Sequence, residues 1–107
     1  MRRIAILGST GSIGVNVLDV VARHPQRYAV AALAANVQWE KLLEQCLQFR
    51  PRVAALLDDA AADALRSALR RAGSDTEVWA GADGVARIGA LADADTIVAA
   101  IVGAAGL

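Results

Sequence analysis

Three glycines spaced three residues apart follow an apolar segment near the start of the chain, and they constrain its fold more than any other feature. Residues 4–7 (IAIL) have the character of a strand, and Gly8, Gly11 and Gly14 come directly after them. We expect Gly8 to permit a sharp turn, Gly11 to let a pyrophosphate approach the backbone, and Gly14 to let a helix pack closely. Backbone amides at the start of that helix would then face an anion. The pattern predicts a phosphate-binding turn.

The glycine spacing is G-x-x-G-x-x-G, which differs from the usual dinucleotide fingerprint G-x-G-x-x-G. The context supports the interpretation, because an amphipathic stretch follows with Ile13, Val17 and Val20 or Val21 on one face. No Gly-Lys-Ser/Thr follows, which disfavours a Walker-type loop. The alternative is a glycine-rich turn between strand and helix that binds no ligand.

Strand-like and helix-like segments alternate along the chain, which predicts an α/β fold with a parallel sheet and helices on both faces, as in a Rossmann-like domain. We expect His24 and Pro25 to end the first helix, Pro51 to end the second, and Asp58 or Asp59 to cap the third, which Gly73 would end. The expected strands cover residues 4–7, 28–35, 52–57, 76–79 and 96–102, and the expected helices cover residues 12–23, 39–49, 59–72 and 82–91.

Apolar residues recur at helical spacing in the second helix, which predicts one stripe facing the sheet. Trp39 follows the second strand, where an adenine could stack on it, but core packing is the interpretation that we favour. The stripe consists of Trp39, Leu42, Leu43, Cys46 and Leu47.

Composition limits the classes of function. The 107 residues suit one small domain, and the equal counts of 11 basic and 11 acidic side chains give no reason to expect nucleic acid or an anionic membrane as a partner. A single cysteine, Cys46, excludes an intrachain disulfide and a multi-cysteine metal site. Met1 runs almost directly into the first strand, and no apolar run approaches the roughly 20 residues of a membrane helix. We therefore expect a cytoplasmic location.

No residue is a clear candidate for catalysis or for binding a metal. His24, the sole histidine, has no second histidine nearby and lies in the last turn of a helix, where a positive charge is favourable. Asp93 and Asp95 form an Asp-x-Asp pair before a strand, without further visible ligands. We expect both aspartates to be solvent-facing turn residues.

The end of the second strand bears on the choice of cofactor. Dinucleotide folds that prefer NAD usually place Asp or Glu there to bind the ribose hydroxyls, whereas this chain has Ala34, Ala35 and Asn36. The missing carboxylate removes a charge that would repel a 2′-phosphate and favours NADP. Lys41 and Arg3 are candidates for the basic partner if the fold brings them near.

Five motifs together resemble 1-deoxy-D-xylulose 5-phosphate reductoisomerase, and the similarity extends over essentially all 107 residues. It concerns the amino-terminal NADPH-binding part of that enzyme. The motifs are LGSTGSIG (7–14), LDVV (18–21), HP (24–25), EQC (44–46) and AAIVGAAGL (99–107).

The resemblance implies which residues bind NADPH. In the family, the loop after the first strand holds the pyrophosphate, and this loop corresponds to Thr10, Gly11, Ser12 and Ile13. The two hydroxyl groups would add donors to the backbone amides.

A second family segment lies near the 2′-phosphate and often carries Gly, then Arg or Lys, then Asn. The corresponding residues are Asn36, Val37 and Gln38. The basic residue is therefore absent, although the two side-chain amides could hydrogen-bond a phosphate or a ribose.

The resemblance also implies the reaction. The family isomerises 1-deoxy-D-xylulose 5-phosphate and reduces the product with NADPH to 2-C-methyl-D-erythritol 4-phosphate, in non-mevalonate isoprenoid biosynthesis. In the family, a divalent metal, Mg or Mn, organises the substrate. The ligands of this metal lie beyond the point matching Leu107. The full-length enzyme of the family is a homodimer. We therefore expect a truncated Rossmann-type domain over residues 1–107, with no catalytic residues and no turnover by itself. The alternatives are another NAD(P)-dependent oxidoreductase and a nucleotide-binding module without catalysis.

Overall fold

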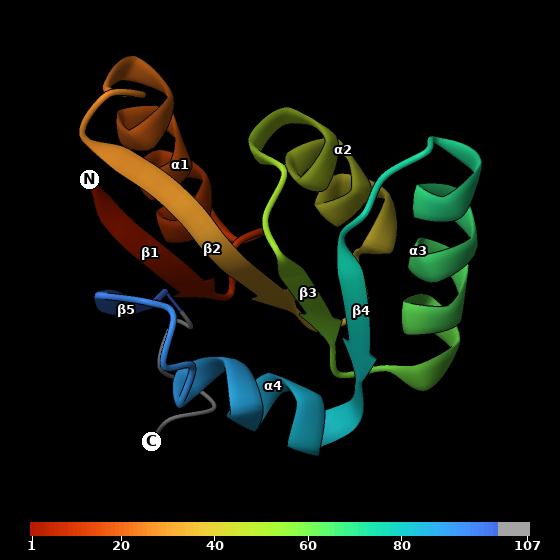
Figure 1. Ribbon diagram of the computed structural model, residues 1–107. Coiled ribbons are helices and arrows are strands. Elements are labelled where there is room, and N and C mark those ends of the chain that lie inside the picture. Colours follow the sequence, from red (N-terminus) through yellow and green to blue (C-terminus); the bar gives the residue numbers. More distant parts are fainter. Residues whose placement is uncertain (101–107) are drawn as a thin grey trace.

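A parallel sheet of five strands forms the centre of the computed structural model, which describes residues 1–100 (Figure 1). The strands lie in the order β4-β3-β2-β1-β5, and all neighbouring pairs are parallel. In chain order the elements are β1 (Arg2–Leu7), α1 (Ser12–Arg23), β2 (Tyr28–Ala35), α2 (Trp39–Phe49), β3 (Val53–Leu56), α3 (Asp59–Arg71), β4 (Glu77–Ala80), α4 (Gly81–Gly89) and β5 (Thr96–Ala99).

The predicted alternation of strands and helices is confirmed, and the bounds of α1, β2 and α2 agree with the predicted ranges. β3 is shorter at both ends than the predicted 52–57. β5 ends at Ala99, whereas the predicted strand covers residues 96–102. Residues 101 and 102 lie outside the described residues.

The order of the strands reverses at β1. From β1 the chain builds outward through β2, β3 and β4, and it then returns through α4 to place β5 on the other side of β1. In open α/β sheets, ligands bind at the carboxyl ends of the strands beside such a reversal. The topology therefore predicts a ligand site at the segments that follow β1 and its neighbours.

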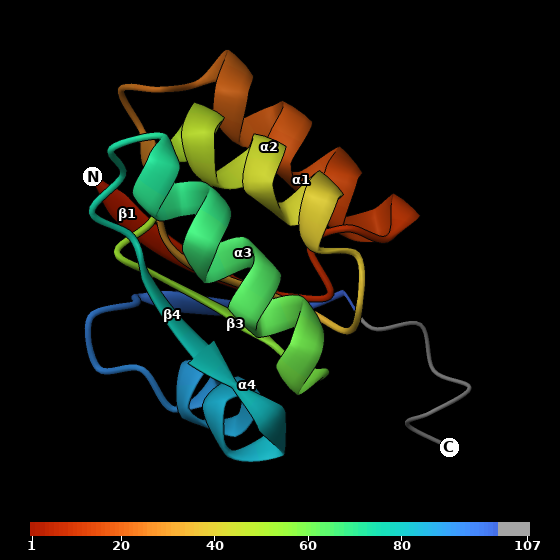
Figure 2. The ribbon, with the colours of Figure 1, turned by 90° about the vertical axis from the view of Figure 1, so that its right-hand side faces the viewer.

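Helices cover both faces of the sheet, as predicted: α1, α2 and α3 lie on one face and α4 lies on the other (Figure 2). Side chains alternate between the faces along each strand. In β1, for example, Ile4 and Ile6 join the core under the three helices, whereas Ala5 joins the core under α4. The buried strand residues facing α4 are mostly alanines, namely Ala5, Ala32, Ala34 and Ala55 with Val53. Their small size lets one helix contact four strands.

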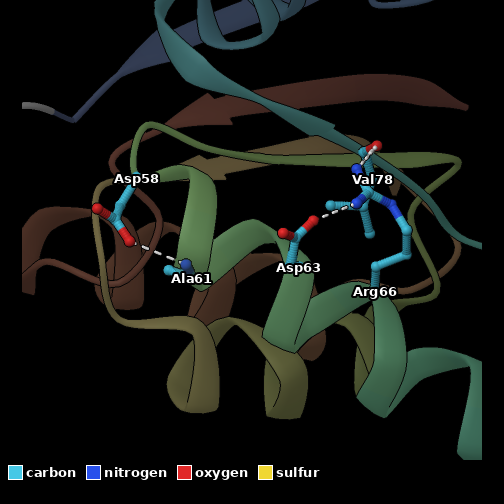
Figure 3. A network of polar contacts seen from close by, with 5 residues as sticks. All are labelled: Asp58, Ala61, Asp63, Arg66 and Val78. Atoms are coloured by element: carbon cyan, nitrogen blue, oxygen red, sulfur yellow. Dashed lines mark hydrogen bonds and ion pairs between the residues drawn. The ribbon is translucent and has the colours of Figure 1, made fainter.

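Polar contacts define the start of α3 and attach it to β4 (Figure 3). The Asp58 side chain accepts a hydrogen bond from the amide of Ala61 at 2.9 Å, which is the predicted amino-terminal cap. Arg66 forms an ion pair with Asp63 and donates to the carbonyl oxygen of Val78 in β4 at 3.2 Å. The cap and the ion pair lie within α3 and its first turn, and the contact of Arg66 with Val78 attaches the helix to β4.

Two predicted apolar stripes need correction. In α2, Leu42 and Cys46 are fully buried, but Leu47 is 45% exposed. Successive helix residues are about 100° apart, so Leu47 lies beyond the edge of the buried face.

In α1, the buried residues are Gly14, Leu18 and Val21, whereas Ile13 is 46% exposed. The helix is rotated by about one residue from the predicted orientation because Gly14 contacts the preceding turn directly. Ile13 therefore lies exposed at the amino-terminal end of α1, beside the turn that follows β1.

Candidate functional site

The turn after β1 bends over the end of β2. The amides of Gly8 and Ser9 both donate to the carbonyl oxygen of Ala34, at 2.7 and 2.9 Å. Gly8 has a φ of 86°, a conformation that residues with a Cβ rarely adopt. The expected sharp turn at Gly8 is therefore present.

Gly14 brings α1 against the turn. A Cβ built on Gly14 would lie 2.4 Å from the carbonyl oxygen of Gly8 and 2.6 Å from the Cα of Ser9. Both are backbone atoms, so neither can move aside without shifting the turn. The close helix packing expected of Gly14 is confirmed.

Gly11 has neither the positive φ of Gly8 nor the close backbone contacts of Gly14. Its φ is −78°, which any residue can adopt, and a Cβ built on it would meet only the carbonyl oxygen of Gly8, at an ordinary 3.6 Å. The fold itself therefore does not require a glycine at this position. A ligand that approaches the backbone closely would require one.

Backbone amides gather at the start of α1. Within residues 1–100, no backbone or side-chain group accepts a hydrogen bond from the amides of Thr10, Ser12 or Ile13. Gly11 is the amino-terminal cap of α1 and has no side chain to satisfy them. Ser12 and Ile13 are exposed and Thr10 is half-buried. Open amides together with the positive end of the helix dipole suit an anion such as a phosphate.

The second predicted segment lies at the same edge of the sheet. Asn36, Val37 and Gln38 follow β2 and are all exposed. Leu7 pairs with Ala34, so the turn after β1 and the segment after β2 leave neighbouring strand ends. The sheet thus brings the two predicted groups, residues 10–13 and 36–38, to adjacent positions.

Of the two basic candidates, the fold brings Lys41 to this site. Its Nζ donates to the carbonyl oxygen of Thr10 at 3.3 Å, and no acidic side chain among the described residues pairs with it. Arg3 lies in β1 five residues before Gly8, about 16 Å away along an extended strand. Arg3 is therefore not a partner for this site.

One further contact was not predicted from the sequence. Ser9 is completely buried, its Oγ donates to Oε1 of Gln45 at 2.8 Å, and Nε2 of Gln45 donates to the carbonyl oxygen of Ser9 at 2.8 Å. Gln45 belongs to α2, and the two residues are separated by 36 positions in the chain. No local pattern indicates a contact over that separation, and the only hint was that both residues lie in the motifs noted above.

Two hollows of the described residues border α2. A hollow of about 450 Å³ borders the amino-terminal ends of β3 and β4, and a groove of about 340 Å³ runs between α1 and α2. Burial raises the pKa of Cys46, which lines the first hollow, to about 12, so its thiol stays protonated and unreactive near neutral pH. Neither hollow is lined by residues 10–13 or 36–38, but Lys41 and Gln45, which contact the turn after β1, line the groove between α1 and α2.

A metal centre is not visible in the part of the chain that the structure describes, since no three His, Cys, Asp or Glu side chains gather there. Asp93 forms an ion pair with Arg52, and the carboxylate of Asp95 accepts from the amide of Arg3 at 2.9 Å. Both aspartates therefore stabilise the connection before β5. None of the four helices in residues 1–100 combines the length and apolar character that crossing a bilayer requires.

The strand order, the reversal at β1 and the glycine turn define a Rossmann-like α/β domain with open backbone amides at one edge of the sheet. The family model of 1-deoxy-D-xylulose 5-phosphate reductoisomerase matches residues 4–107. The chain therefore belongs to the 1-deoxy-D-xylulose 5-phosphate reductoisomerase family, as its motifs suggested.

Relatives and solved structures agree with this assignment. Over the full chain it is 57% identical to the 1-deoxy-D-xylulose 5-phosphate reductoisomerase of Nitrosospira multiformis and 53% identical to that of Aromatoleum aromaticum. It spans 27% of the length of each of these relatives. A crystal structure of DOX-P reductoisomerase with NADPH, fosmidomycin and magnesium superposes with a TM-score of 0.92 at 38% identity, covering 100% of this chain and 26% of that one. The Zymomonas mobilis enzyme in complex with NADPH gives 0.82 at 36% identity, covering 90% and 25%.

Proposed function

We propose that residues 1–107 form the NADPH-binding domain of a 1-deoxy-D-xylulose 5-phosphate reductoisomerase. The observation that carries the proposal is the turn at residues 8–14, where amides without partners meet a glycine, Gly11, that the fold does not require. The similar structures with bound NADPH support the same ligand.

Thr10, Gly11, Ser12 and Ile13 hold the pyrophosphate in this proposal. The amides of Thr10, Ser12 and Ile13, which have no partner among residues 1–100, supply hydrogen-bond donors, and the hydroxyl groups of Thr10 and Ser12 add two more. A Cβ on Gly11 would meet only the carbonyl oxygen of Gly8, at 3.6 Å, and would occupy space that a phosphate needs to reach the backbone.

Asn36, Val37 and Gln38 lie at the ribose end of the cofactor in this proposal. The two side-chain amides are exposed and can donate to a ribose hydroxyl or to the 2′-phosphate. Lys41 adds a positive charge at the neighbouring turn, where its ammonium group donates to the carbonyl oxygen of Thr10.

The complete reaction isomerises 1-deoxy-D-xylulose 5-phosphate and reduces it to 2-C-methyl-D-erythritol 4-phosphate, in non-mevalonate isoprenoid biosynthesis. When bound, NADPH supplies the hydride. The described residues do not fit a divalent metal, so we derive no metal-dependent step from them. We propose that this chain contributes cofactor binding to a cytoplasmic, homodimeric enzyme and has no turnover by itself.

Equilibrium titration of the folded chain with NADPH, NADH and ATP tests the proposal. We expect NADPH to bind most tightly, because only NADPH carries both a pyrophosphate and a 2′-phosphate. Circular dichroism on the same sample verifies that it is folded. Equal affinity for all three nucleotides, or no binding by a folded sample, contradicts the proposal.

A further inference from the structure

Two side chains of α2 hold consecutive carbonyl groups of the turn after β1. Gln45 donates from Nε2 to the carbonyl oxygen of Ser9 at 2.8 Å, and Lys41 donates from Nζ to that of Thr10 at 3.3 Å. Lys41 and Gln45 are four residues apart, so they project from the same side of the helix. The turn is therefore attached to α2 at two successive peptide groups.

The Gln45 contact is the more constrained of the two. The buried hydroxyl of Ser9 donates to Oε1 of Gln45 and thereby orients the side-chain amide, so that Nε2 faces the Ser9 carbonyl. Ser9 has no exposed surface, so both hydrogen bonds satisfy polar atoms that solvent does not reach in the folded chain. Lys41, by contrast, is exposed to solvent.

Fixing the carbonyl of Ser9 also fixes the amide of Thr10. Both groups belong to one planar trans peptide, so they point in opposite directions. With the carbonyl of Ser9 directed at Gln45, the amide of Thr10 is directed away from α2. That amide has no partner among residues 1–100.

We propose that Gln45 is a positioning residue, which orients the amide of Thr10 toward the bound phosphate without touching the cofactor. This inference rests on the proposed function. α2 thereby takes part in both predicted segments of the site. The helix begins directly after residues 36–38, and its Gln45 sets the geometry of the pyrophosphate loop. An amide already oriented before binding loses no freedom when the ligand arrives.

The substitution Gln45→Glu tests the inference, because it keeps the shape of the side chain and the acceptor for the Ser9 hydroxyl but removes the donor to the Ser9 carbonyl. We expect the dissociation constant for NADPH to rise roughly tenfold, about the effect of one lost hydrogen bond in a buried site. Gln45→Met, which is uncharged, should weaken binding in the same direction. The matched control is Gln48→Glu, an exposed position on the same helix with the same change in charge, where we expect less than about a twofold change.

Amide NMR spectra distinguish positioning from a general loss of stability. In Gln45→Glu, the Thr10 amide signal should move in the free protein, while the signals of β2 and β3 stay in place. Binding within about twofold of the unmodified chain, with an unmoved Thr10 signal, would overturn the inference and leave the proposed function intact. Failure of the unmodified chain to bind NADPH would overturn both.

If the Gln45 variants do not fold, the unmodified chain still provides a test. Saturation with NADPH should shift the Thr10 amide signal, and the Gln45 side-chain amide should exchange slowly with solvent. A Thr10 signal that does not respond to saturating NADPH refutes the inference.

Discussion

Replacing Gly14 and Gly11 separately by alanine distinguishes a glycine that the fold needs from one that a ligand needs. At Gly14 the new Cβ would lie 2.4, 2.6 and 2.8 Å from three backbone atoms of Gly8 and Ser9. At Gly11 the new Cβ has a single neighbour at 3.6 Å, and the φ of −78° suits alanine. The same chemical change therefore has different consequences only three residues apart.

The magnitudes follow from these contacts. Overpacking against rigid backbone costs about 3 kcal/mol, and the better helix propensity of alanine returns about 1 kcal/mol, so Gly14→Ala should destabilise by about 2 kcal/mol. For a chain of this size that lowers the melting temperature by about 10 °C. Gly11→Ala loses only the preference for glycine at a helix cap, less than about 1 kcal/mol.

Thermal unfolding and NADPH titration of both variants provide the assay. We expect Gly11→Ala to unfold near the parent temperature but to bind NADPH at least about tenfold more weakly, because its methyl group occupies the approach of the pyrophosphate. Gly11→Val should weaken binding further while the helical spectrum persists. Parent-like affinity in a folded Gly11→Val variant would refute the assignment of the turn.

Three further predictions concern stability. Asp58→Ala removes the cap on the Ala61 amide and should cost about 1 kcal/mol in chemical denaturation, and a change below about 0.3 kcal/mol would contradict the cap. Arg50 ends α2 with a φ of 50°, so Arg50→Gly should stabilise the chain by about 1 kcal/mol in the same assay, whereas a loss would contradict the strain. The pKa of Cys46 is raised from 9.0 to about 12 by burial, so the stability that its protonated thiol contributes is complete below pH 9 and is lost as the pH rises toward 12. A thiol reagent at pH 8 should therefore label the unfolded chain much faster than the folded one, and equal rates would contradict the burial.

The local patterns predicted the order of the elements and most of their bounds. Proline, aspartate and glycine at the helix ends act on neighbouring residues, so Asp58 and Gly8 could be interpreted from sequence alone. The rotation of each helix about its own axis could not be predicted as well from the sequence. Ile13 and Leu47 are apolar and have helical spacing, but a rotation of one residue moves each off the buried face, and the contact that sets this rotation in α1 involves Gly14.

Contacts between elements account for the rest of the site. Sequence analysis named both Lys41 and Arg3 as candidates, and only the arrangement of α2 beside the first turn selects Lys41. The pair of hydrogen bonds between Ser9 and Gln45 joins residues 36 positions apart, and polarity alone does not reveal such a contact. The roles of residues 10–13 and 36–38 in binding stay predictions, although the sheet places them at one edge.

The structure of the chain bound to NADPH is the measurement that tests the central claim most directly. We predict pyrophosphate oxygens within about 3.2 Å of the amides of Ser12 and Ile13, in front of Gly11. A nucleotide bound in the groove between α1 and α2, or one whose pyrophosphate avoids the turn after β1, would contradict the claim.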